Sequence, residues 1–187
     1  MGLVSQCAIR AVSVSMAWLI FAAPVFADIE SSKVFELIDQ RLEYMRQVAL
    51  YKASTGTPVE DRYREAIVIE KAKKKAEKVG LAPASIEGFF RAQIAAAKVI
   101  QYRHIADWTL SKKMPDEKPA DLEVEIRPLL TNLGDEIVVA IKRYLDSGNR
   151  FGDDQLGEFH RIVAVEKLDK SDVGALYESM RSITLAQ

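Results

Sequence analysis

Apolar residues recur at helical spacing along most of the chain, beginning shortly after residue 28. Between Ile29 and about Ser54 there is no glycine or proline, and the apolar positions follow one another in steps of three and four. They are Val34, Leu37, Ile38, Leu42, Met45, Val48 and Ala49. This spacing places them on one face and predicts a single long amphipathic helix that Gly56 ends.

The next segment has the signals of a helix start and a helix stop. In the run Thr57-Pro58-Val59-Glu60, Thr57 is predicted to be the N-cap and Pro58 to lie in the first turn, while Glu60 completes a capping box. The helical pattern then continues to about Val79, where Gly80 follows. We therefore predict a second helix between these two signals.

The rest of the chain is also predicted to be helical. Pro83 opens a third helix with Ser85 as its N-cap, and this helix runs to about Trp108. Residues 111–120 are polar and contain two prolines, which is typical of a linker. Further helices are expected over 121–146, 154–165 and 171–184. No alternating strand pattern is seen, so the sequence predicts an all-α protein of about six helices.

The first 27 residues have the pattern of a secretory signal peptide. One charge, Arg10, precedes an apolar run over 11–24, and small residues stand at the −3 and −1 positions of a junction after Ala27. An uncleaved membrane anchor is the alternative, although the run is short for a span of about 20 residues. We predict cleavage after Ala27, periplasmic or secreted localisation, and a single mature domain over 28–187.

Composition excludes several classes of function. The chain has 187 residues and is 49% hydrophobic, with 26 basic and 27 acidic residues, which argues against a nucleic-acid-binding protein. Its one cysteine, Cys7, lies in the predicted leader, so thiol chemistry, disulfides and zinc–cysteine sites are excluded from the mature protein. His104 and His160 lie too far apart and lack accompanying ligands, so no metal site is predicted.

Two cations on the first predicted helix are spaced so that they share a face. Arg41 and Lys52 are eleven residues apart. On an α-helix their side chains then point within about 20° of the same direction, and their positions are separated by a rise of ~16 Å along the axis. Both point with the apolar stripe, roughly three turns apart. Two long cationic side chains in this arrangement can hold a small dianion between them.

Further polar residues recur at helical spacing on the second and third predicted helices. Asp61, Arg64 and Glu65 lie on one face, and Ala97 and Gln101 lie one turn apart. The residues alone leave two interpretations open, and surface ion pairs at helical spacing are a commoner explanation of such a pattern than a binding site.

Three motifs that follow one another along the chain favour the binding-site interpretation. They are the Arg41/Lys52 pair in the pattern R-x10-K, the P-V-x-D-x-x-R-E segment starting at Pro58, and the A-Q-I-x-x-x-K-x-I-Q-Y run over 92–102. Together, over about residues 34–108, the chain resembles the all-helical chorismate mutases, and most closely their exported subgroup, in which a single chain builds its own site.

The resemblance implies a function and a role for each matched residue. It implies the rearrangement of chorismate to prephenate without a cofactor, in which the protein holds a folded dianion and stabilises charge on the ether oxygen. Arg41 and Arg64 match the carboxylate-binding arginines, and Lys52 matches the cation at the ether oxygen. Gln101 matches the second donor to that oxygen, and Glu65 matches the acceptor for the ring hydroxyl.

Some parts of the family site are less well defined in this chain. Asp61 is expected beside Glu65, and a further cation is expected from the second half of the chain, for which Arg127 and Arg143 are the candidates. Ala97 replaces a hydroxyl-bearing residue of several relatives, and Val68 replaces a glutamine of some. The implied organisation is a catalytic core over 28–110, the linker over 111–120, and C-terminal helices over 121–187 that complete the site.

The expected partner is the small molecule chorismate, with no nucleic acid and no membrane contact after cleavage of the leader. The sequence leaves monomer and homodimer open. A catalytically silent helical binding protein is the alternative function. Against it, cations and a glutamine on inward-facing stripes are costly to desolvate unless an anionic ligand binds them.

Overall fold

The computed structural model describes residues 23–187, with side chains from Glu30 onward. Most of the predicted signal peptide, including the side chains at its cleavage junction, therefore lies outside the described residues. The prediction of an all-α protein is confirmed, since within 23–187 extended pairing is limited to an isolated bridge between Leu81 and Leu185. The helices are α1 Ala23–Glu43, α2 Met45–Thr55, α3 Arg62–Val79, α4 Pro83–Ser111, the π-helix η1 Leu122–Ile126, α5 Arg127–Asp146, the 3-10 helix η2 Asp153–Gln155, α6 Leu156–Ile162 and α7 Lys170–Met180.

The first predicted helix is divided into two. The prediction of one helix from Ile29 to Ser54 is wrong at Tyr44, where the chain turns between α1 and α2 while Val48 N still donates to Tyr44 O. The apolar spacing runs through this turn unchanged, so the sequence pattern does not reveal it. Helix α1 packs on α5 and α2 packs on α4, so the two halves of the predicted helix contact different partners on either side of the turn. Counted as one bent rod, α1 and α2 give the six α-helices expected for the described chain.

The predicted capping box at the second helix is wrong. Helix α3 starts at Arg62, and its N-cap is Asp61, whose Oδ1 accepts a hydrogen bond of 2.9 Å from Arg64 N. Thr57 lies in a non-helical segment over 56–61, which we call the 56–61 connector, and its hydroxyl bonds to that of Thr55. Threonine and aspartate are both good caps, and the position of the connector decides between them.

Ser85 is likewise not the N-cap of its helix. It lies in the first turn of α4, which begins at Pro83 after Ala82. Its hydroxyl donates to Ala82 O at 2.7 Å and accepts from Thr184 N at 3.1 Å. The serine therefore ties the C-terminal segment to the start of α4.

Helix boundaries in the second half differ modestly from the predicted ones. Residues 112–121 are non-helical, and the predicted helix over 121–146 begins as the π-helix η1, which Asp121 caps, before it continues as α5. The last two helices are shorter than predicted, since α6 ends at Ile162 and α7 ends at Met180.

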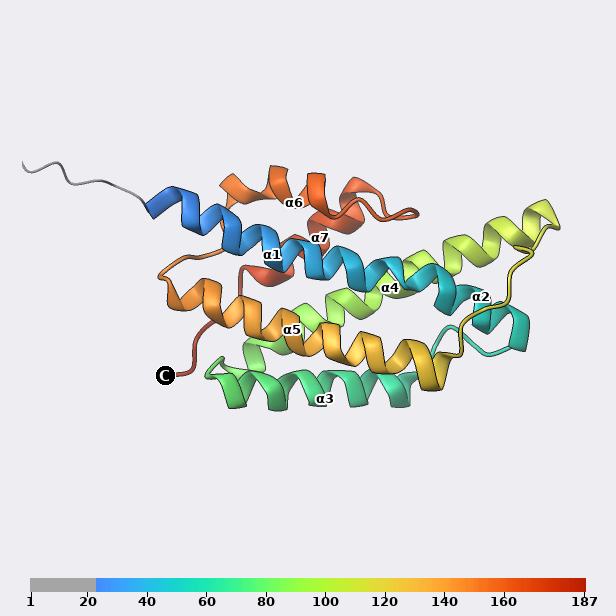
Figure 1. Cartoon of the computed structure of the whole chain (residues 1–187), viewed down its shortest axis with the longest axis horizontal. Helices are drawn as coiled ribbons and strands as arrows, with labels where there is room; N and C mark the ends of the chain where they lie inside the picture. The colour runs from blue at the N-terminus through green and yellow to red at the C-terminus, as the bar shows by residue number, and fades with distance from the viewer. Residues whose placement is uncertain (1–22) are drawn as a thin grey trace, which may run out of the picture.

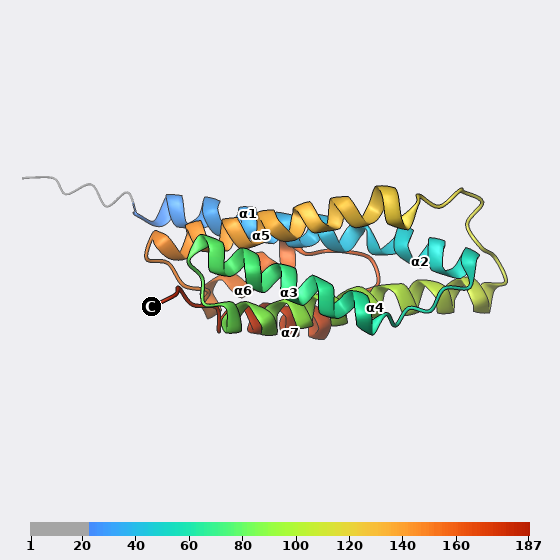
Figure 2. The same cartoon turned by 90° about the horizontal axis from the view of Figure 1, so that it is seen from below.

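The longer helices run roughly along the long axis of the molecule (Figure 1). Helix α1 packs against α5, and α4 packs against α3, α2 and α7. In the view from below, the segment after α4 crosses back at one end of the molecule to reach α5, while the C-terminus lies at the opposite end, near the start of α1 (Figure 2). The helices that carry the predicted site residues are therefore side by side.

An aromatic cluster fixes the last two helices on α1. Phe35 is fully buried, and its ring centroid lies 5.0 Å from that of Phe159 on α6 and 6.1 Å from that of Tyr177 on α7. Phe151 stacks on Tyr144 at 4.6 Å and lies 6.2 Å from Phe35. This cluster holds α1, and with it the start of the site, against the C-terminal part of the chain.

Replacing the ring at the centre of this cluster should destabilise the protein strongly. Phe35→Ala is expected to lower the free energy of unfolding by ~3–5 kcal/mol, because a large buried side chain leaves a cavity. The matched control, Leu110→Ala, alters a side chain that is 83% exposed and should change it by less than ~0.5 kcal/mol. Urea unfolding followed by circular dichroism measures both, and equal effects would show that the cluster does not anchor α1.

Candidate functional site

A cavity between the helices brings together the residues predicted from the first half of the chain to form a site. Its lining draws on α1, α2, the 56–61 connector, α3, α4, η1 and α5. The predicted residues among the lining are Arg41, Lys52, Asp61, Arg64, Glu65 and Gln101. Residues separated by up to sixty positions in the chain thus face one space, as the helical spacing predicted.

Arg41 is the most deeply buried cation of the cavity. Its side chain is 5% exposed, and its Nη1 donates to Gln93 Oε1 at 3.3 Å. Its Nε makes no hydrogen bond within the described chain. Burial, and to a lesser degree the nearby Arg64, lowers the pKa of Arg41 to about 10, so it remains charged at neutral pH. The chain thus holds a buried guanidinium without a carboxylate bonded to it.

Lys52 reaches the cavity from α2. It is 7% exposed, and its Nζ donates to Val59 O in the 56–61 connector at 2.8 Å. Burial lowers the pKa of Lys52, an effect that the Asp61 carboxylate partly offsets. An ammonium group has three hydrogens, so two remain for a ligand after this bond.

Gln101 lies opposite on α4 and is 4% exposed. Its Nε2 donates to Ala97 O at 3.0 Å and lies 3.7 Å from the Met45 sulfur, which is only a weak acceptor. Its Oε1 is buried without a hydrogen-bond partner in the described chain. The amide therefore retains hydrogen-bonding capacity inside the cavity.

Of the two C-terminal cations considered, the structure brings Arg127 to the cavity. Its Nη2 lies 3.3 Å from Asp61 Oδ2, and it also pairs with Glu123. Arg143 is exposed and is not part of the cavity lining. Burial and the charge of Arg127 both lower the pKa of Arg64, so these two cations lie close enough to repel.

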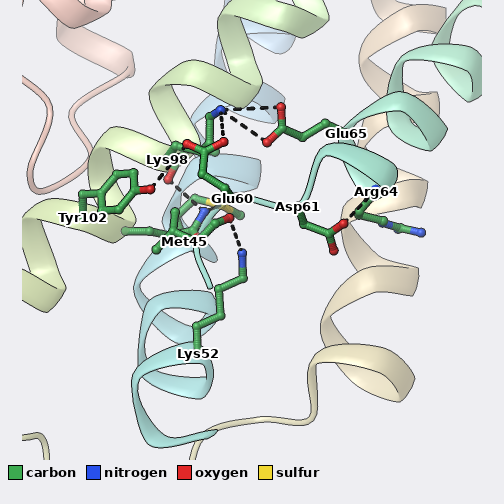
Figure 3. A network of polar contacts seen from close by, with 11 residues as sticks. Met45, Lys52, Glu60, Asp61, Arg64, Glu65, Lys98 and Tyr102 are labelled. Carbon is green, nitrogen blue, oxygen red and sulfur yellow. Dashed lines mark hydrogen bonds and ion pairs between the residues drawn. The ribbon is translucent and has the colours of Figure 1, made fainter. Parts of the chain in front are cut away.

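Glu65 faces the cavity from the first turn of α3, where it is paired with a lysine. Lys98 Nζ on α4 lies 3.3 Å from Glu65 Oε1 and 2.9 Å from Glu60 Oε2 (Figure 3). Figure 3 also shows Lys52 directed at the 56–61 connector from the other side. The connector is therefore held by one lysine from α2 and another from α4.

Gln93 and Lys98 both stand in the A-Q-I-x-x-x-K-x-I-Q-Y run that carries the family resemblance, but neither was assigned a role from the sequence. Gln93 is fully buried, and its Nε2 has no acceptor in the described chain. The signal for Gln93 was present, because it stands on the same face of α4 as Phe90 and Ala97, where the pattern is otherwise apolar. Lys98 is the lysine of the same run, but its partners Glu60 and Glu65 lie on another part of the chain, so helical spacing does not indicate what it binds.

The chemistry that the cavity can support follows from its lining. Six basic and three acidic residues line it, beside apolar walls that include Val68 and Ala97. The lining contains no serine, cysteine or histidine, and no cluster of metal-ligating residues occurs in the described part of the chain. This arrangement is suited to binding a small anion with an apolar body and to stabilising negative charge.

Comparisons of the sequence agree with this picture. The family described as chorismate mutase type II matches residues 31–102. The chain is 36% identical to a secreted chorismate mutase of Yersinia pestis over 149 residues, which is 80% of this chain and 79% of that protein. It is 32% identical to a monofunctional chorismate mutase of Enterobacter agglomerans over 177 residues, 92% and 96% of the two chains.

Comparisons of the fold give the same family. The crystal structure of the secreted chorismate mutase from Yersinia pestis matches with a TM-score of 0.76 and 36% identity, covering 82% of this chain and 97% of that one. The chorismate mutase from Burkholderia thailandensis matches with a TM-score of 0.70 and 28% identity, covering 82% and 99%.

The burial of Arg41 leads to a prediction about stability. Gln93→Leu should lower the free energy of unfolding by ~1–3 kcal/mol, because the guanidinium loses its only described hydrogen-bond acceptor while it remains buried. The double variant Gln93→Leu/Arg41→Met should regain the lost stability, and its free energy of unfolding should exceed that of the wild type by about 1 kcal/mol. Both polar groups are then replaced by apolar ones of similar size. Urea unfolding without ligand measures the three proteins.

The matched control is Arg46→Met, which removes a half-exposed arginine paired with Glu117 at 2.6 Å. It should change the free energy of unfolding by less than ~1 kcal/mol. A double variant less stable than Gln93→Leu alone would contradict the interpretation that burial of the Arg41 charge lowers the stability of the protein.

Proposed function

This chain belongs to the chorismate mutase family, and we propose that its cavity rearranges chorismate to prephenate in one step, with Lys52 and Gln101 acting on the ether oxygen. The observation that carries the proposal is the meeting of buried Arg41, Lys52 and Gln101 at one cavity of a single chain. Arg41 Nε has no hydrogen-bond partner in the described chain, Lys52 Nζ has one, and the second Nε2 hydrogen of Gln101 meets only the Met45 sulfur, a weak acceptor.

The chemistry of the substrate explains why such a cavity is sufficient. Chorismate carries two carboxylates and an enolpyruvyl ether, and its rearrangement breaks one C–O bond while it forms one C–C bond within the same molecule. The reaction needs no nucleophile and no proton transfer. Rate enhancement then comes from holding the reactive folded conformer and from stabilising the charge that grows on the ether oxygen.

Three arginines are proposed to hold the two carboxylates. Arg41 and Arg64 approach from α1 and α3, and a guanidinium can donate two parallel hydrogen bonds to one carboxylate. Of the two C-terminal candidates we propose Arg127 as the additional cation, supported by its place in the cavity lining and its contact with Asp61. Asp61 caps α3 and pairs with Arg127, so it orients the arginine beside the substrate.

Lys52 and Gln101 are proposed to act at the reacting ether. The Val59 carbonyl fixes the direction of the Lys52 ammonium and leaves two of its hydrogens for the ether oxygen and a neighbouring carboxylate. Gln101 donates from the opposite side, with its amide oriented by the Ala97 carbonyl. Both groups are fixed before the substrate binds, so they need little reorganisation as charge develops.

The remaining contacts complete the proposed site. Glu65 accepts a hydrogen bond from the ring hydroxyl of the substrate, as a carboxylate facing the cavity can do. Ala97 and Val68 provide only apolar wall, so neither supplies the polar contact that some relatives have there. No cofactor or metal is part of the proposal.

We further propose that the protein is exported and that its leader is cleaved after Ala27. The Yersinia pestis relative is described as secreted, which supports export. None of the described helices is long and apolar enough to span a membrane. The proposed mature chain over 28–187 joins core helices over 28–110 to C-terminal helices over 121–187, and the cavity draws on both. A homodimer is compatible with this site but is not needed to build it.

Loss of chorismate absorbance by the purified protein tests the proposed function. We expect conversion of chorismate to prephenate in buffer containing EDTA, since the proposed chemistry uses no metal. Prephenate is identified by its acid-catalysed conversion to phenylpyruvate. A folded protein that binds chorismate without converting it would instead support a catalytically silent binding protein.

Paired lysine variants show whether the activity comes from this cavity. Lys52→Ala should raise the activation barrier by ~3–4 kcal/mol, as expected on loss of one donor to developing charge. Lys73→Ala is the control, because Lys73 is a lysine on α3 outside the cavity lining and should leave kcat unchanged. Equal, small effects on kcat would remove Lys52 from the proposed role.

The pH dependence of the activity of Gln101→Glu tests the proposed role of Gln101 as the second hydrogen-bond donor to the ether oxygen. An ionised carboxylate only accepts hydrogen bonds and repels the negative charge on the ether oxygen, whereas a protonated carboxyl group can donate. The activity of the variant should therefore be low at neutral pH and rise as the pH falls, while the wild-type amide does not titrate. We propose measuring kcat/KM of both proteins from about pH 4.5 to 8, with circular dichroism to monitor folding. Parallel profiles would contradict the role of Gln101.

A further inference from the structure

Lys98 joins three parts of the chain beside the cavity. From α4 it lies 2.9 Å from Glu60 Oε2 in the 56–61 connector and 3.3 Å from Glu65 Oε1 in the first turn of α3. Tyr102, one turn further along α4, donates to Glu60 Oε1 at 3.4 Å. Figure 3 shows this network on the side of the connector opposite Lys52.

The Lys98–Glu65 ion pair differs from an ordinary surface ion pair in two ways: it lies at the cavity, and its side chains are largely buried. The side chains of Lys98 and Glu65 are about three-quarters buried, and both residues line the cavity. Hydrogen bonding to Glu60, and secondly to Glu65, raises the pKa of Lys98. Lys98 thus stays charged and presents its ammonium to the carboxylate that the proposed function assigns to the ring hydroxyl.

We propose that Lys98 is a positioning residue for substrate recognition: it holds the Glu65 carboxylate in the direction of the ring hydroxyl of chorismate, as its acceptor. The inference rests on the proposed function and adds a residue to it. A carboxylate has several lone pairs, so Glu65 can bind Lys98 and still accept a hydrogen bond from the hydroxyl. Without the lysine, the side chain of Glu65 loses its partner and can take other rotamers.

The same lysine also holds the 56–61 connector through Glu60. That connector supplies the Val59 carbonyl that binds Lys52. A purely structural effect of Lys98 would therefore act through Lys52 and reduce catalysis for every substrate. An effect through Glu65 is specific, because it depends on the presence of the ring hydroxyl. This difference allows the two roles to be separated by experiment.

The chain offers a matched control in Lys73. Lys73 on α3 also binds two glutamates, Glu70 on its own helix at 3.1 Å and Glu87 on α4 at 3.4 Å. Its side chain is 31% exposed, against 25% for Lys98. Both lysines thus link α3 to α4, but Lys73 lies outside the cavity lining.

The experiment compares the wild type, Lys98→Met and Lys73→Met with two substrates, chorismate and its analogue in which hydrogen replaces the ring hydroxyl. With chorismate, Lys98→Met should lower kcat/KM about tenfold, equivalent to about 1.4 kcal/mol, while Lys73→Met should stay within about twofold of the wild type. With the analogue, both variants should stay within about twofold of the wild type. Lys98→Arg should recover part of the loss with chorismate, because it keeps the charge.

Each contrary result has a distinct meaning. An equal loss with both substrates would overturn the inference, because Lys98 would then act through the connector and Lys52. An unaffected Lys98→Met would overturn it as well. A wild type inactive toward chorismate would overturn the proposed function itself, and the inference with it. Thermal unfolding of the variants identifies any loss that comes from misfolding.

Discussion

The central feature of the structure is the burial of two cations, Arg41 and Lys52, neither of which has a carboxylate hydrogen-bonded to it in the described chain. Arg41 and Lys52 are almost fully buried, and their described hydrogen bonds go to the neutral groups Gln93 Oε1 and Val59 O. Burial lowers the pKa of both side chains, because removing a cation from water is unfavourable. The proposed function places a dianion between them, and its charge is the missing counter-charge, so the feature that costs stability is the one proposed to provide affinity for the substrate.

The helical scaffold holds the two buried cations in place. Helices α1 and α2 bring the two cations to the cavity, and the aromatic cluster around Phe35 anchors α1 against the C-terminal helices. The 56–61 connector crosses between Lys52 and Lys98, so the two lysines fix the segment that leads into α3. All of the described elements that line the cavity belong to one chain.

Helical spacing predicted the all-α fold and the common face of Arg41 and Lys52, because both follow from local geometry. It missed the turn at Tyr44, where the apolar pattern continues, and it placed the α3 cap at Thr57 rather than Asp61, since only packing of the connector distinguishes them. The contact of Arg127 with Asp61 spans 66 residues and has no local signal, so spacing could not choose it over Arg143. Lys98 belongs to a quoted motif, but its contacts with Glu60 and Glu65 are also distant in the chain and have no local signal.

The most direct test of the account is ligand-linked stability of the protein. The thermal midpoint is measured against increasing concentrations of an unreactive bicyclic dicarboxylate shaped like the transition state of the rearrangement, with its diester as control. The account predicts that the dicarboxylate stabilises the wild type by about 2.7 kcal/mol at 100 times its Kd and stabilises Arg41→Met far less. An unchanged midpoint, or equal stabilisation by the uncharged diester, would contradict the claim that buried cations await a dianion.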